Sequence, residues 1–330
     1  MKSLIHSSVS SLLGLCLAIP AFQVTLGQQS KILIEGEKPV VLFDGGFFLE
    51  GPAVAPDQSV YFSDITFTGA SGMQAGHIWR YDPATGKTEL FRSPSGMSNG
   101  IIFDLEGNMV IAQGADYGGR AIIRTDMETG KSYIAANRYE GKRFNSPNDL
   151  VIDTKGRIYF TDPRYAGDEP VELPVQGVYR VDTVGSAHRI ISQIGTPNGI
   201  VISPDQEYLY VASINGPYWM HFNGLVRYDL DGNGDVSNRK VLIEYENEPG
   251  PDGMAVDEAG NLYLARSPEK PGIYIHDPNG GFIDMIPLPE NPTNVTFGHG
   301  PTSGTLYITA GKSLYRIRVN ARGFIQAYQN

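Results

Sequence analysis

NDLVIDTKGRIYFTD, residues 148–162, is one of six stretches along this chain that share a single pattern. Each begins with an acid or an amide, continues with an apolar pair and a turn, and ends in a strand of alternating apolar and polar residues. The other five are EGPAVAPDQSVYFSD (50–64), NGIIFDLEGNMVIAQ (99–113), NGIVISPDQEYLYVAS (198–213), DGMAVDEAGNLYLAR (252–266) and NVTFGHGPTSGTLYIT (294–309). An internal repeat of this length indicates an architecture built from stacked, similar units.

A second hairpin follows each stretch, for example HIWRYDPATGK from His77 and GIYIHDPNGG from Gly272. Four short strands joined by tight turns make one propeller blade. The stretches start 49, 49, 50, 54 and 42 residues apart, so six units fill the chain and a seventh would not fit. The sequence therefore predicts an all-β fold, a six-bladed β-propeller formed as one domain by residues 28–330. The apolar segment 31–43 is expected to complete the last blade and close the ring, because an unpaired strand edge is a liability.

The first 27 residues have the features of a signal peptide. Met1 and Lys2 give a cationic start, and residues 9–20 form an apolar stretch too short to span a bilayer. Cleavage is expected after Gly27, with Ala21 as the alternative site. We therefore expect an exported protein, periplasmic or secreted, with no membrane attachment after cleavage.

Charge and cysteine content exclude several classes of function. The formal net charge is −10 and the calculated pI is near 5.1, which argues against a nucleic-acid partner and suits a cation. The only cysteine, Cys16, lies in the predicted signal peptide, so the mature chain has neither disulfides nor a zinc-thiolate site. We expect a monomer or a weak homo-oligomer.

The first residues of the six stretches, which we call the column, are the most informative feature. A propeller places the starts of its innermost strands around the central channel, so these distant residues become neighbours. All six carry side-chain oxygens: Glu50, Asn99, Asn148, Asn198, Asp252 and Asn294. Calcium binds six to eight such oxygens, whereas zinc and copper prefer histidine or cysteine. The column predicts a central divalent-cation site, with Ca²⁺ as the first candidate and other divalent cations as alternatives.

An ordinary turn role is the competing interpretation of the column. Pro-Asn-Gly and Pro-Asp-Gly are common turn sequences, and one such motif carries little weight. Gly, Ser or Lys would serve a turn equally well, and a turn would not select Glu50 at the first position. Six oxygen-bearing residues in register therefore favour the metal site.

Four motifs around the column resemble those of a known family. They are EGP (50–52), RFNSPND (143–149), PNG (197–199) and PDGM (251–254). Together they are similar to the signature motifs of the SMP-30/gluconolactonase/regucalcin family and the diisopropylfluorophosphatase-like calcium propellers. The resemblance covers almost all of the chain after the signal peptide. It implies a calcium-dependent hydrolase of lactones.

The resemblance also implies roles for individual residues. Glu50, Asn148, Asn198 and Asp252 match the positions that hold the catalytic cation, and Asp252 matches the proton acceptor and donor. In some members the residue that matches Asn148 serves the substrate instead.

Three further residues are expected to bind the substrate. Arg143 resembles an arginine that binds sugar-lactone hydroxyls, although three extra residues separate it from Asn148. Asn99 occupies a position that varies among relatives, and His299 lies where phosphotriesterase-like propellers have a histidine. Residues 162–165 are expected to help line the same mouth.

The chemistry is consistent with hydrolysis of a sugar lactone such as gluconolactone to the open aldonic acid. A cation polarises the carbonyl, and a neighbouring carboxylate handles the proton of the attacking water. Two alternatives remain: a different lactone, ester or phosphotriester as substrate, and a non-catalytic propeller that binds sugar or protein around a structural calcium.

Overall fold

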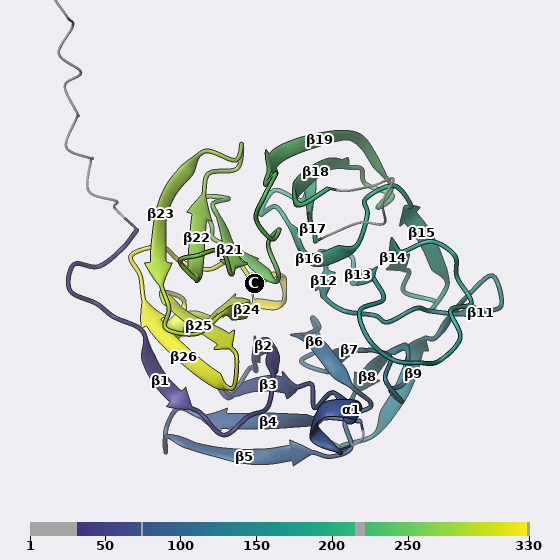
Figure 1. Ribbon diagram of the computed structural model, residues 1–330, viewed down its shortest axis with the longest axis horizontal. Coiled ribbons are helices and arrows are strands. Elements are labelled where there is room, and N and C mark those ends of the chain that lie inside the picture. The colour runs from purple at the N-terminus through teal and green to yellow at the C-terminus, as the bar shows by residue number, and fades with distance from the viewer. Residues whose placement is uncertain (1–31, 74, 215–221, 329–330) are drawn as a thin grey trace, which may run out of the picture. The chain divides into compact units, whose positions relative to one another are not determined.

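The computed structural model describes residues 32–73, 75–214 and 222–328, and these form six four-stranded antiparallel sheets arranged around a central axis (Figure 1). This confirms the predicted all-β, six-bladed propeller. The predicted signal peptide, residues 1–27, lies outside the described residues. None of the helices in the described part of the chain has the length and hydrophobicity needed to cross a bilayer.

In five blades the four strands are arranged from the axis outward in the order in which they occur along the chain. In the last blade the outermost strand comes instead from the start of the chain. The innermost strands are β2 Leu49–Val54, β6 Ser98–Phe103, β12 Leu150–Ile152, β16 Pro197–Ile202, β20 Met254–Val256 and β24 Pro292–Phe297. The second strands are β3 Val60–Asp64, β7 Met109–Gln113, β13 Ile158–Asp162, β17 Tyr208–Ser213, β21 Leu262–Arg266 and β25 Thr305–Ala310. The third strands are β4 His77–Asp82, β8 Ala121–Thr125, β14 Gly177–Val181, β18 Gly224–Leu230, β22 Gly272–His276 and β26 Ser313–Arg318. The outermost strands are β5 Lys87–Arg92, β9 Ser132–Ala136, β15 Ala187–Ile191, β19 Val236–Glu244, β23 Phe282–Pro287 and β1 Val40–Phe43.

The last blade closes the ring, because β1 from the start of the chain pairs with β26 from its end. The last blade thus joins both ends of the domain, as the segment 31–43 led us to expect. Phe43 at the end of β1 contacts Phe62 and Trp79 of the first blade, with ring centroids 5.7 and 5.1 Å apart. The closing strand therefore also contacts the neighbouring blade.

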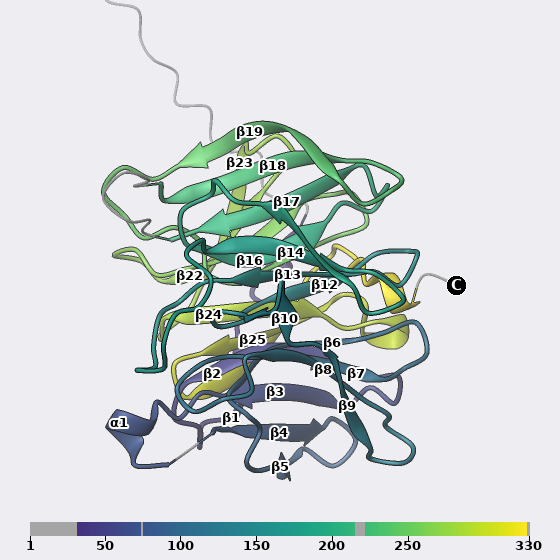
Figure 2. The same ribbon diagram turned by 90° about the vertical axis from the view of Figure 1, so that its right-hand side faces the viewer.

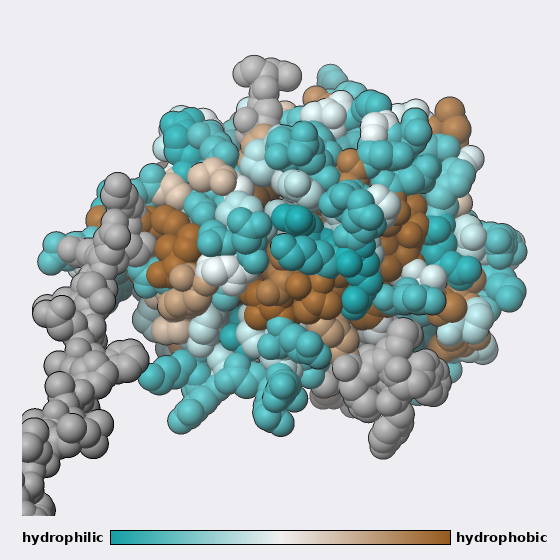
Figure 3. Space-filling view, turned by 90° about the horizontal axis from the view of Figure 1, so that it is seen from above, coloured by the Kyte–Doolittle hydropathy of each residue, from teal (hydrophilic) through white to brown (hydrophobic). Residues whose placement is uncertain are grey.

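The core lies between the blades, as six hydrophobic clusters that each join two neighbouring sheets. Side chains alternate along a strand, so each blade contributes to the clusters on both of its faces. In β13, Ile158 and Phe160 belong to the cluster with the second blade, and Tyr159 between them belongs to the cluster with the fourth. Seen from its edge, the outer surface is largely hydrophilic, with hydrophobic side chains gathered near its middle (Figure 3).

Five short elements among the described residues lie outside the six blades. The strands β10 Arg138–Tyr139 and β11 Lys142–Arg143 form a separate hairpin, α1 spans Thr68–Ser71, and two 3₁₀ turns span Gly300–Thr302 and Gln326–Tyr328. Helix α1 and the end of the described chain near Tyr328 lie on opposite faces of the ring (Figure 2). The two ends of the central channel are therefore covered by different parts of the chain.

Candidate active site

Five of the six column residues line one cavity, of about 230 Å³, at the end of the channel where the inner strands begin: Glu50, Asn99, Asn148, Asn198 and Asp252. The first four are buried and Asp252 is half-buried. The sixth, Asn294, lies deeper and lines the other half of the channel. The fold thus brings together residues that are about fifty positions apart in the sequence.

Glycines beside the column allow the inner strands to approach closely. The Gly100 N–H donates to the Asn148 carbonyl at 2.7 Å, and the Gly199 N–H donates to the Asp252 carbonyl at 3.1 Å. A β-carbon on Gly199 would lie 2.4 Å from the Asp252 carbonyl oxygen, which is too close for any side chain. The glycines that follow Asn99 and Asn198 therefore determine how closely the neighbouring column side chains approach one another.

Three carboxyl groups share this part of the channel. Burial raises the pKa of Glu50 well above its usual range, and the negative charges of Asp252 and Asp149 raise it further. Burial also raises the pKa of Asp252 to about 7, with a contribution from the Asp149 charge. The pKa of Asp149, raised by burial, is likewise about 7, although its carboxylate accepts a hydrogen bond from the Leu150 N–H at 2.9 Å. Negative charge is thus concentrated where a cation would relieve it.

The cavity also contains an amide oxygen without a partner. The Oδ1 atom of Asn99 is buried and accepts no hydrogen bond from any described residue. An unsatisfied buried acceptor costs free energy, which a bound group that donates a hydrogen bond would offset. A hard cation bound by amide and carboxylate oxygens would likewise offset the charge repulsion. Three of the five donors are asparagines, and no group of three or more His, Cys, Asp or Glu side chains suited to a metal is found among the described residues. The donor set fits Ca²⁺ or another hard cation.

Loops that follow second strands or precede an inner strand supply further lining residues. Tyr165 lines the cavity, as the position of residues 162–165 led us to expect. About half of this residue is exposed, but desolvation of its hydroxyl group and the charges of Asp252 and Glu50 raise its pKa above the usual range. Ser146 and Asp116 also line it, and the sequence did not indicate them. Ser146 Oγ accepts a hydrogen bond from the Ala115 N–H at 2.9 Å, and Asp116 Oδ2 accepts one from the Thr68 N–H at 2.7 Å.

Residues 48–312 match the family described as the SMP-30/Gluconolactonase/LRE-like region. The chain belongs to this family. Within the SMP-30/gluconolactonase family it is similar to a gluconolactonase of Zymomonas mobilis, at 35% identity over 71% of this chain and 65% of that protein. The match therefore spans slightly less than two thirds of that relative's length.

Two other proteins are also similar. A 6-deoxy-6-sulfogluconolactonase of Pseudomonas putida is 27% identical over 78% of this chain and 80% of that protein. The solved structure of a gluconolactonase of Xanthomonas campestris superimposes with a TM-score of 0.75, at 26% identity, covering 87% of this chain and 91% of that one.

Arg143, expected from the family resemblance to bind substrate, does not line the cavity. Its Nη2 atom donates to the Gly119 carbonyl at 2.9 Å, and its backbone N–H donates to Glu172 at 2.9 Å. Arg120 and Arg164 bind to the backbone of the same loops. Arg120 donates a hydrogen bond to the carbonyl oxygen of Phe144, and Arg164 donates one to the carbonyl oxygen of Asn145. The three arginines therefore hold the backbone of the loops that carry the lining residues. The structure offers no support for a direct substrate role of Arg143.

His299 lies at the opposite end of the inner strands from the cavity. Its ring stacks on Tyr328 with centroids 3.6 Å apart, and its Nε2 atom lies 2.9 Å from the carbonyl oxygen of Ala55, which follows the last residue of β2. Glu50 stands at the start of the same strand. Because a six-residue strand is about 17 Å long, His299 cannot contact a substrate bound beside Glu50.

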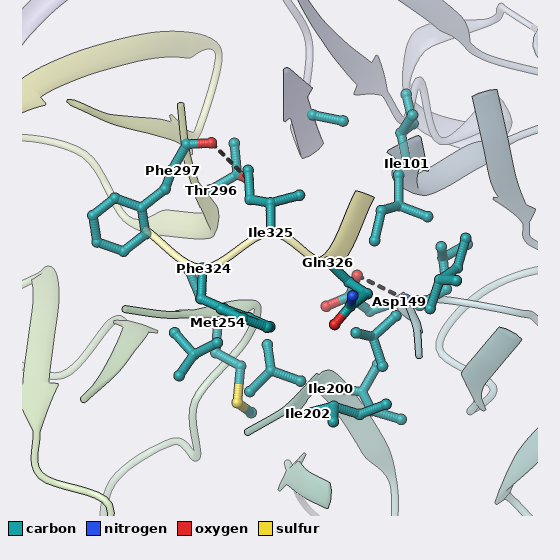
Figure 4. A pocket seen from close by; sticks show the side chains of 18 of the residues that line it. Ile101, Asp149, Ile200, Ile202, Met254, Thr296, Phe297, Phe324, Ile325 and Gln326 are labelled. Atoms are coloured by element: carbon teal, nitrogen blue, oxygen red, sulfur yellow. Dashed lines mark hydrogen bonds between the residues drawn. The ribbon is translucent and has the colours of Figure 1, made fainter. Parts of the chain in front are cut away.

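The C-terminal segment closes this opposite end. Phe324, Ile325 and Gln326 extend across the channel, among apolar side chains such as Ile200 and Met254 (Figure 4). Tyr328 donates its hydroxyl proton to the Val54 carbonyl at 2.8 Å, which fixes the end of the segment. The cavity at the column is therefore entered from the other face.

Proposed function

We propose that this chain is a hydrolase that opens lactones with the help of a divalent cation bound at the column. The observation that carries the proposal is the convergence of two carboxylates and three amide side chains on one cavity. Membership of the SMP-30/gluconolactonase family and the names of its lactonase relatives support the choice of lactones. A sugar lactone such as gluconolactone is the first substrate to try.

Glu50, Asn148, Asn198 and Asp252 are the proposed ligands, with Ca²⁺ as the cation. Their oxygens are of the type that calcium prefers, and Glu50 and Asp252 supply the charge. When bound, the cation would polarise the lactone carbonyl and stabilise the negative charge that develops on its oxygen.

Asp252 is the proposed proton acceptor and donor. As water attacks the carbonyl carbon, a carboxylate oxygen of Asp252 accepts one of its protons. The bond between the carbonyl carbon and the ring oxygen then breaks, and Asp252 returns the proton to that oxygen. The product is the open hydroxy acid, and Asp252 is regenerated. Asn198 lies beside Asp252 and hydrogen-bonds to it, which favours the ionised form.

Asn99 and Asn148 are the proposed contacts to the substrate. Asn99 Oδ1 has no described partner and can accept a hydrogen bond from a substrate hydroxyl. Arg143 and His299 are not included, because neither side chain lines the cavity.

A substrate panel tests the proposed function. The purified protein is assayed with aldonolactones, aryl esters and organophosphates, with Ca²⁺ and after treatment with a chelator. We expect lactones to be opened and the chelator to abolish the activity, which Ca²⁺ should restore. Activity on esters or phosphotriesters but not on lactones would show that the proposed substrate class is wrong. Absence of any turnover with Ca²⁺ bound would favour a binding protein.

Export is a separate part of the proposal. It relies on the cationic start and the apolar residues 9–20. The intact mass of the protein isolated from its natural host should correspond to a chain that begins at Gln28. A mass that includes Met1 would exclude cleavage.

A further inference from the structure

The cavity is lined unevenly. Most of its apolar side chains, which we call the apolar wall, belong to the first two blades and lie just before their inner strands or after their second strands: Phe48, Ile65, Phe67, Met97 and Ala115. Ala166 of the third blade and Ile214 of the fourth are apolar lining residues outside this wall. Phe48 and Phe67 meet edge to face, with ring centroids 5.3 Å apart. Hydroxyl groups that can bond to a substrate, those of Ser146 and Tyr165, belong to loops of the third blade. A bound molecule would thus meet hydrocarbon on one side and polar groups on another.

Positive charge is missing from the described residues that line the cavity. They include the acids Glu50, Asp116 and Asp252, and no Lys, Arg or His. A divalent cation would leave this set with a residual negative charge. The nearby arginines Arg120 and Arg164 donate to backbone carbonyls of the loops and do not line the cavity. An anionic group on a substrate would therefore find no cationic side chain among the described residues that line the cavity.

We infer that the site selects uncharged lactones that present a hydrocarbon surface to the apolar wall, and that it rejects lactones bearing a carboxylate, sulfonate or phosphate. This inference rests on the proposed lactonase function. Hydroxyls pressed against the apolar wall would lose their hydration without gaining a partner. An added negative charge would be repelled by the acids that line the cavity.

Three 1,5-lactones that differ at a single substituent test the inference. They are 6-deoxygluconolactone, gluconolactone and 6-deoxy-6-sulfogluconolactone, which carry a methyl, a hydroxymethyl and a sulfomethyl group. Ring opening is followed by acid release with Ca²⁺ bound. We expect kcat/KM for the sulfonate to be lower than for the other two by about tenfold or more, and the methyl lactone to be opened at least as well as gluconolactone. Equal turnover of the sulfonate, or a methyl lactone that reacts tenfold more slowly than gluconolactone, would overturn the inference.

Variants of the apolar wall provide the first control. Met97→Gln keeps the length of a buried side chain in the wall but makes it polar. It should lower the ratio of the methyl to the hydroxymethyl lactone, whereas Met73→Gln, at an exposed position outside the cavity, should leave the ratio unchanged. An unchanged ratio in Met97→Gln would contradict the role of the wall.

Charge variants provide the second control. Ala166→Lys places a cation at the half-buried rim and should raise kcat/KM for the sulfonate. Val171→Lys adds the same charge at an exposed position outside the cavity and should have no effect. Equal effects of the two would show that overall charge, and not the cavity, sets the preference.

Failure of the inference is distinguishable from failure of the proposed function. If all three lactones react equally, the lactonase function stands and the selectivity is wrong. If none reacts, the function is wrong, and binding of the three corresponding lactams measured by calorimetry then decides the selectivity. Weaker binding of the sulfonated lactam supports it, and equal binding overturns it.

Discussion

At the scale of the residue, Asp252 and Asn198 show how similar donors can differ in role. Both line the cavity and can offer an oxygen to a cation, but only Asp252 can accept a proton. Asp252→Asn should therefore leave the fold intact and lower turnover by roughly 10²- to 10⁴-fold. Lactone hydrolysis and circular dichroism of the variant check this. Turnover at the wild-type rate would exclude the proposed proton transfer.

The raised pKa values of the site carboxyls predict a coupling between protons and the cation. Without the cation, Asp252 titrates at about 7 because of burial, so it is largely protonated below that pH. Calcium needs the ionised form, so its affinity should fall as the pH drops below about 7. Binding near neutral pH should release roughly one proton. Calorimetry in buffers of different ionisation enthalpy measures the released protons, and the absence of proton release would contradict the burial of these groups.

The same shift has a consequence for stability. A carboxyl whose pKa is higher in the folded than in the unfolded state stabilises the fold when protonated, and this contribution is lost as the pH rises toward the folded pKa. In the cation-free protein, Asp252 and Asp149 should therefore lower the free energy of unfolding as the pH rises from about 4 to 7. Bound Ca²⁺ should remove this dependence, and thermal melts with chelator and with Ca²⁺ test it.

At the scale of the element, Tyr328 helps to hold the C-terminal segment in place. Tyr328 stacks on His299 and donates to the Val54 carbonyl, so Tyr328→Ala should lower the free energy of unfolding by about 2 kcal/mol. Tyr133→Ala, at an exposed position in β9, should change it by less than about 0.5 kcal/mol. Denaturation with urea compares the two variants. Equal losses would show that the segment contributes little to closing the channel.

Elements that repeat could be predicted from the sequence, and elements that occur once could not. The column was identifiable because Glu50, Asn99 and their counterparts recur about every fifty residues at the start of an inner strand. Phe48, Met97 and Ser146 each precede a column residue by two positions, but the residue type differs from blade to blade, so the spacing alone did not mark them as lining residues. Asp116 and Phe67 lie in loops after second strands, which differ in length between blades. Their contribution to the cavity became visible only in three dimensions.

Two expected substrate contacts show the limits of spacing along the chain. His299 follows an inner strand, but it follows the end of β24 and so lies at the far face, whereas the column occupies the start of each strand. Arg143 lies only a few residues before Asn148, but its guanidinium turns to the Gly119 carbonyl. Closeness along the sequence therefore predicted neither the end of the strand at which His299 lies nor the direction in which the Arg143 side chain points.

At the scale of the whole molecule, closure of the ring depends on β1. Phe43 joins the last blade to the first through its contacts with Phe62 and Trp79. Phe43→Ala should destabilise the domain by about 2 kcal/mol, less than the loss of a fully buried phenylalanine. Val41→Ala on the same strand, where the side chain is about half exposed, should cost less than about 0.5 kcal/mol. Unfolding in guanidinium chloride is the measurement, and an equal effect of the two changes would contradict this role of β1.

We propose that oxygen-bearing side chains from separate blades bind a single divalent cation at the axis of the ring. A crystal structure of the protein grown with Ca²⁺ is the measurement that tests this binding. We expect one ion, with oxygens of Glu50, Asn198 and Asp252 at about 2.3 to 2.6 Å from it. Those three side chains directed away from one another, with no ion between them in the presence of Ca²⁺, would contradict it.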